Sequence, residues 1–174
     1  MNLAKKLGFF FGLSLIIMAL FGCMTAESSV KGTPTTIDTL GGDSFDAIVL
    51  IDNLVEGVKI AKIGDNSFAI YANIMTSGRT AYPGSLIFTI DGTKNTIIGP
   101  TGWDIVDVSV DQHNVTRWWN TSTSMSDRLI ESFKDATTIN IRAINSSGYM
   151  GSMGEDKGID ISTILPVVNE FLSK

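Results

Sequence analysis

The feature that most constrains the fold is a succession of short β-branched and aromatic runs separated by turn-forming residues. Residues 58–75 and 86–99 each contain two such runs. The first pair flanks Gly64-Asp65-Asn66-Ser67 and the second flanks Asp91-Gly92-Thr93-Lys94. Paired runs joined by turns of this composition are typical of β-hairpins. Because consecutive hairpins give antiparallel neighbours, the sequence predicts an antiparallel sheet and disfavours a parallel βαβ array.

The remaining pattern adds further strands and two helices. Apolar and β-branched runs predict strands at Phe45–Asp52, Trp103–Val110, Val115–Asn120 and Thr137–Ile144. Imperfect alternation in the second of these predicts a β-bulge near Ile105. Apolar residues at helical spacing predict one helix from Ser124, capped by Ser124 and Asp127, to Ala136 and another over Ser162–Leu172. We expect a mainly β or α+β fold: an antiparallel sheet or sandwich of about seven to eight strands with two helices near the C-terminus.

The first 23 residues follow a different pattern. Lys5 and Lys6 precede an uncharged apolar run that extends from Leu7 to Gly22, and the only cysteine, Cys23, comes next. A basic start, an apolar core and a small residue before the cleavage point are typical of a secretory signal peptide. The end of this run, Leu20-Phe21-Gly22-Cys23, resembles the lipobox of bacterial lipoproteins and departs from it at Phe21.

This resemblance implies cleavage before Cys23, a diacylglycerol on its sulfur and a further acyl chain on the new amino terminus. Each buried CH₂ contributes about 0.8 kcal/mol, so two or three chains anchor a protein stably. Since Met24 rather than aspartate follows, the resemblance implies export to the outer membrane of a diderm bacterium. Two alternatives remain open: an uncleaved membrane anchor, for which roughly 20 apolar residues suffice, and an ordinary buried thiol at Cys23.

We expect three parts: a signal peptide at 1–22, a lipidated flexible tether at 23–43 and a single globular β-rich domain at 44–174. The tether assignment depends on a composition rich in Ser, Thr and Gly without an apolar period. The leader holds two of the 13 basic residues and none of the 18 acidic ones, so the remaining 152 residues carry a formal charge of −7. This acidic balance disfavours nucleic acid as a partner, because phosphate binding requires clustered Lys and Arg.

One segment suggests catalysis. Gly42-Asp43-Ser44-Phe45 resembles the Gly-Asp-Ser block of SGNH-type esterases, in which the serine is the nucleophile and a histidine in an Asp-x-x-His motif near the C-terminus is the base. The only histidine is His113, and Asp111 precedes it by two positions rather than three. A turn that enters the first strand explains the block better, so we expect no enzyme. An envelope hydrolase that uses Ser44, or another serine, with His113 remains the alternative.

We expect neither a metal nor a cofactor. Three closely spaced aspartates form the candidate calcium cluster: Asp104, Asp107 and Asp111. In a regular strand the first points away from the face that the other two share. Neither the ligand spacing of an EF-hand nor a His and Cys set for zinc is present. The glycine-rich segment 148–158 is expected to be flexible, with Met150 and Met153 as an adaptable apolar contact surface.

The most suggestive feature is Arg117-Trp118-Trp119. Adjacent side chains of a strand point to opposite faces, so one tryptophan should pack and the other should face outward or lie under a loop. An exposed Trp beside an Arg is typical of anchors in protein interfaces and sugar sites. With Tyr82, these are the candidate binding residues. The sequence therefore favours a noncatalytic, lipid-anchored envelope protein that binds a protein or a small ligand, and a purely structural lipoprotein is a further alternative.

Overall fold

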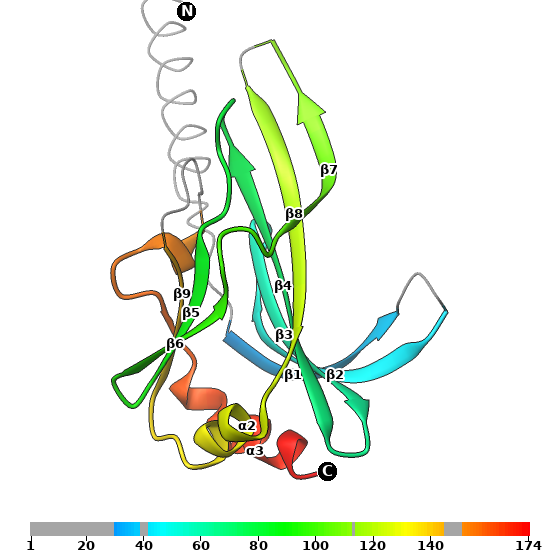
Figure 1. Ribbon diagram of the computed structural model, residues 1–174, viewed down its shortest axis with the longest axis vertical. Coiled ribbons are helices and arrows are strands. Elements are labelled where there is room, and N and C mark those ends of the chain that lie inside the picture. The colour runs from blue at the N-terminus through cyan, green and yellow to red at the C-terminus, as the bar shows by residue number, and fades with distance from the viewer. Residues whose placement is uncertain (1–29, 39–41, 113, 145–150) are drawn as a thin grey trace, which may run out of the picture.

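The computed structural model describes residues 30–38, 42–112, 114–144 and 151–174. Within these ranges ten strands form two antiparallel sheets, so the predicted fold class is confirmed and the strands exceed the expected seven or eight (Figure 1). The larger sheet has the order β1 (Val30–Asp38), β2 (Ser44–Asp52), β3 (Glu56–Gly64), β4 (Ser67–Ser77), β8 (Val115–Ser124) and β7 (Asp104–Val110). The smaller has the order β10 (Ile159–Asp160), β9 (Ile139–Ile144), β5 (Ser85–Ile90) and β6 (Thr93–Ile98).

In Figure 1, α2 (Asp127–Lys134) and α3 (Leu165–Leu172) lie together at one end of the sheets. The C-terminal segment also contains two short 3₁₀ helices, η1 (Ser152–Gly154) and η2 (Ser162–Ile164). The predicted start and cap of the first helix were wrong. Ser124 is the last residue of β8, opposite Ala69 of β4. Ser126 caps α2 instead, because its hydroxyl accepts a hydrogen bond from the backbone N–H of Leu129 at 3.3 Å. Pro166 falls in the first turn of α3, as the sequence predicted.

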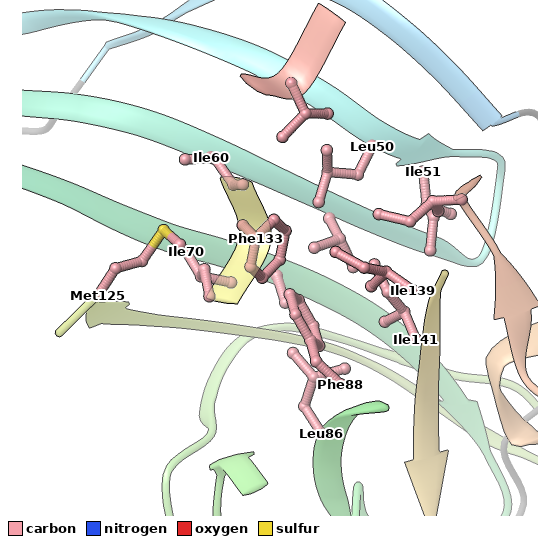
Figure 2. Close-up of a cluster of buried hydrophobic side chains, with 14 of the residues drawn as sticks. Leu50, Ile51, Ile60, Ile70, Leu86, Phe88, Met125, Phe133, Ile139 and Ile141 are labelled. Carbon is pink, nitrogen blue, oxygen red and sulfur yellow. The ribbon is translucent and has the colours of Figure 1, made fainter. Parts of the chain in front are cut away.

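The hydrophobic core lies between the two sheets and is closed by α2 and α3 (Figure 2). The run Ile48–Ile51 is entirely buried, as its unbroken apolar character predicted. Phe88 of β5 meets Phe133 of α2 with ring centroids 5.7 Å apart, so an aromatic contact joins the smaller sheet to the first helix. The buried side chains form one continuous core. Burial of each large apolar side chain stabilises the folded state by about 1.5–3 kcal/mol.

The globular domain begins earlier in the chain than the sequence predicted. Residues 30–38, predicted as part of the flexible tether, form β1, which pairs with β2 from Asp38 opposite Ser44 onward. The prediction was wrong because polar, Thr-rich segments form strands when a neighbouring strand supplies hydrogen-bond partners. Gly32, with φ of +57°, lies against Ile164, which fixes β1 to the C-terminal helical segment.

Two further expectations concern irregular segments. The bulge predicted near Ile105 is confirmed, since the register of β7 against β8 shifts between Ile105 and Asp107. Met153 is fully buried in η1, so the expectation that it forms a surface contact was wrong. Met150 lies outside the described residues.

Candidate functional site

The face of the six-stranded sheet that points away from the core carries an open groove of about 420 Å³. Its lining comes from five strands: Ile37 of β1, Lys59 of β3, Tyr71, Ala72 and Asn73 of β4, Val106 and Asp107 of β7, and Trp118, Asn120 and Thr121 of β8. Ile37 and Val106 belong to the two edge strands of this sheet, yet both line the groove. The sheet is therefore strongly curled, with this face on its concave side.

The alternation of side chains along β4 places its polar residues in the groove. Ile70, Ala72 and Ile74 are buried, whereas Tyr71 and Asn73 between them are not. Side chains of a strand alternate between the two faces, so the apolar set faces the core and the polar set faces outward.

The register between neighbouring strands then brings the lining side chains together. Asn73 lies opposite Asn120, Met75 lies opposite Trp118, and Tyr71 lies opposite Lys59. Residues directly opposite each other on one face of an antiparallel pair have Cβ atoms about 4.5–5.5 Å apart. The two amides and the tryptophan therefore occupy neighbouring positions across β4 and β8.

The two adjacent tryptophans point to opposite faces, as predicted. Trp118 is half-buried and lines the groove. Trp119 packs against the core, and its Nε1 donates a hydrogen bond to Oγ1 of the buried Thr76 at 2.9 Å. Trp119 therefore stabilises the fold, whereas the side chain of Trp118 faces the groove.

Arg117 lies on the same face of the sheet as Trp119. It contacts a loop and does not line the groove. Its two terminal nitrogens donate hydrogen bonds to the carbonyl oxygens of Gly78 at 3.0 Å and Arg79 at 3.1 Å. Tyr82, in the same loop, is 52% exposed and does not line the groove. Of the four candidate binding residues, only Trp118 lies in the groove, and the structure separates it from Arg117, Trp119 and Tyr82.

Most of the groove lining was not predicted from the sequence, in particular Lys59, Tyr71, Asn73 and Asn120. Asp107 was named only as a candidate calcium ligand. The polar interruptions of the apolar run in β4 were a usable signal for an outward face. Nothing local to the sequence indicates that this face is concave, because the curl arises from the packing of six strands.

A glycine explains the position of one amide in the groove. A Cβ added to Gly57 of β3 would lie 2.5 Å from Oδ1 of Asn73, so the amide of Asn73 lies directly over this glycine. A glycine within a strand often marks such a close approach. Gly57 thus allows Asn73 to lie low against the sheet.

The candidate catalytic serine, Ser44, forms a hydrogen bond with a nearby residue of the adjacent strand. The hydroxyl of Ser44 donates a hydrogen bond to Oδ1 of Asp38 at 2.8 Å, on an exposed pair of residues where β1 and β2 meet. His113 lies outside the described residues, so the pairing of Ser44 with His113 stays a prediction. Cys23 and the leader also lie outside them.

No group of three or more His, Cys, Asp or Glu side chains in the part of the chain that the structure describes could hold a metal ion. No helix within the same ranges has the length and apolar character needed to span a bilayer.

Comparison with known proteins does not identify a relative. No protein-family model matches the chain, and neither the curated proteins nor the solved structures contain a significant match.

Proposed function

We propose that this protein is a noncatalytic, lipid-anchored binding module of the cell envelope, with its ligand site in the groove around Trp118. The observation that carries the proposal is a half-buried tryptophan, set among polar side chains, on the concave face of the larger sheet. The groove volume, about 420 Å³, lies within the range of about 300–1,000 Å³ typical of small-ligand sites.

The lining favours a saccharide as the ligand. Trp118 and Tyr71 offer aromatic surfaces on which the C–H face of a sugar ring packs. The amides of Asn73 and Asn120 both donate and accept hydrogen bonds, as sugar hydroxyls do. Lys59 and Asp107 add one charge of each sign, which matches a neutral, hydroxyl-rich ligand better than a strongly charged one.

The ligand proposal is tested by screening immobilised glycans with the purified full-length chain and then measuring the affinity of a bound glycan by calorimetry. Trp118→Ala should weaken binding at least tenfold, because aromatic anchors commonly contribute 2 kcal/mol or more, about 30-fold in affinity. Tyr82→Ala is the matched control, since it removes an exposed aromatic ring outside the groove. Equal affinities of the two variants would contradict a Trp118-centred site.

The anchor proposal depends on Leu20-Phe21-Gly22-Cys23. Its test is the intact mass of the protein from a bacterial host, beside that of a Cys23→Ala variant. We expect a chain that begins at Cys23 and carries acyl groups, and we expect the variant to lack them. A full-length, unmodified chain in the membrane fraction would instead indicate an uncleaved anchor.

A further inference from the structure

Strand β7 forms an edge of the larger sheet and exposes an unusual amount of apolar surface. All seven of its residues are exposed. Among the described residues, four of the seven exposed large hydrophobic side chains belong to this strand: Ile105 (50%), Val106 (54%), Val108 (46%) and Val110 (72%). Proteins usually protect a sheet edge because its unpaired backbone groups can pair with another strand. An edge that also presents clustered apolar side chains indicates an interaction surface.

The hairpin geometry shows which backbone groups face the open edge. The N–H of Asp111 donates a hydrogen bond to the carbonyl of Asn114 at 3.0 Å, and Ser109 lies opposite Thr116 further along the same hairpin. Hydrogen-bonded and non-hydrogen-bonded pairs alternate along an antiparallel ladder, so Asp107 and Ser109 direct their backbone groups toward β8. Val108 and Val110 therefore direct theirs outward. In the isolated chain the N–H of Val108 donates a hydrogen bond to Oδ1 of Asp107 at 2.8 Å.

The opposite edge of this sheet is protected by its sequence. Strand β1 contains Pro34, which has no backbone N–H, and its register against β2 shifts between Val30 and Thr33. Proline and irregular pairing both hinder the addition of another strand. The β7 edge has no proline, and its one irregularity lies between Ile105 and Asp107.

We propose that two copies of this protein associate through their β7 strands, which pair antiparallel about Val108. In this register Val108 lies opposite Val108 of the partner subunit. Asp107 lies opposite Ser109 of the partner subunit, on the face that carries the groove. The Asp107 carboxylate releases the N–H of Val108, which then donates to the carbonyl of the partner's Val108.

The charges of β7 disfavour the two registers next to this one. A shift by two residues in one direction sets Asp107 opposite the partner's Asp107, and the same shift in the other direction sets it opposite the partner's Asp111. Like charges directly opposite each other destabilise a strand pair. The register about Val108 places the two Val108 side chains beside each other and no aspartate opposite another, which is the complementarity that a second copy requires.

This pairing joins the two six-stranded sheets into one continuous sheet. Residues directly opposite each other in an antiparallel pair project on the same face, so both grooves open on the same side. A ligand with repeating units would then contact two sites at once, which raises its apparent affinity without a new contact. The pairing itself does not depend on the ligand class.

Cross-linking of the full-length protein in detergent tests the proposal. Val108→Cys should form an intersubunit disulfide on mild oxidation, because opposite residues of a hydrogen-bonded pair have Cα atoms about 5.5 Å apart, within disulfide range. Val167→Cys is the matched control, since Val167 is 42% exposed but lies on α3. The unsubstituted chain, whose only cysteine is Cys23, gives the background.

A second variant tests the association without a thiol. Val108→Lys should lower the dimer affinity at least tenfold in sedimentation measurements, while Val167→Lys should leave it unchanged and both should keep the native circular dichroism spectrum. Cross-linking of Val108→Cys at the level of Val167→Cys would overturn the proposal. An unsubstituted protein that sediments as a monomer at high micromolar concentration would do the same.

Discussion

The carboxylate of Glu56 accepts a hydrogen bond from the backbone N–H of Met153 across 97 positions of sequence, with Oε2 and N 2.9 Å apart. Its other oxygen, Oε1, accepts from the N–H of Ser152 at 3.0 Å and from the side-chain amide of Asn53 at 2.9 Å. Glu56 is fully buried, so these bonds replace the water that an ionised carboxylate loses on burial. One side chain thereby ties the turn between β2 and β3 to the first turn of η1.

Glu56→Ala should lower the free energy of unfolding by about 3 kcal/mol, since hydrogen bonds to a charged group contribute about 1.5–3 kcal/mol and buried donors are left unpaired. Urea unfolding followed by tryptophan fluorescence gives the value. Glu56→Gln, which keeps Oε1 as an acceptor, should lower the free energy of unfolding by less than Glu56→Ala does. If both substitutions prove neutral, the carboxylate does not hold these two segments together.

The hydrogen bonds of Asp91 should make the free energy of unfolding depend on pH in the acid range. Its carboxylate accepts hydrogen bonds from the hydroxyl of Thr137 at 2.7 Å and from the N–H of Thr138 at 2.8 Å. These bonds, the Thr137 hydroxyl first, lower the pKa of Asp91 from 3.8 to about 2. Because the pKa is lower in the folded protein, this stabilisation is fully present above about pH 4 and is lost as the pH falls toward 2.

Asp91→Asn should therefore flatten the acid limb of the stability curve, measured as the urea midpoint between about pH 4 and pH 2. Asparagine also accepts the positive φ of this position, +44°, so the substitution leaves the turn intact. Asp65→Asn, in the exposed turn between β3 and β4, is the matched control. An unchanged acid limb in Asp91→Asn would contradict this assignment.

Replacing Gly158 should destabilise the protein, because its backbone conformation and surroundings leave no room for a side chain. It has φ of +65°, and a Cβ at this position would lie 2.5 Å from the carbonyl oxygen of Ile141. A left-handed conformation costs other residues about 1–2 kcal/mol and the backbone contact adds to this, so Gly158→Ala should lose about 2 kcal/mol or more. Gly99→Ala, where a Cβ meets nothing within 4 Å, should be close to neutral. Thermal unfolding of the two variants checks the difference, and equal melting temperatures would contradict the predicted clash.

The hairpins could be predicted from the sequence because their information is local. The Asp91-Gly92 turn has positive φ at both residues, and this is the conformation that Asp-Gly favours in a tight hairpin. β1 was missed because its strand character depends on β2, and the division into two sheets depends on pairings such as Ile74 with Trp119. Such contacts join distant parts of the chain, so they cannot be predicted from a local sequence pattern.

The candidate site was predictable only in part, for the same reason. Alternation along β8 correctly separated Trp118 from Trp119, because it follows from strand geometry alone. The same reasoning could not show that Arg117 would bond to Gly78 and Arg79. Nor could it show that the face of Trp118 is concave, since this depends on the curl of the whole sheet.

The most direct test of the proposed ligand site is a titration of the protein with a bound glycan, followed through the indole N–H signals of its three tryptophans by nuclear magnetic resonance. Trp103 and Trp119 are internal controls, because their Nε1 atoms donate to the carbonyl of Gly84 at 2.8 Å and to Thr76 at 2.9 Å. We expect a saturable shift of the Trp118 signal with much smaller changes in the other two. A glycan that binds without shifting the Trp118 signal, or a full glycan screen without binding, would contradict the proposed ligand site.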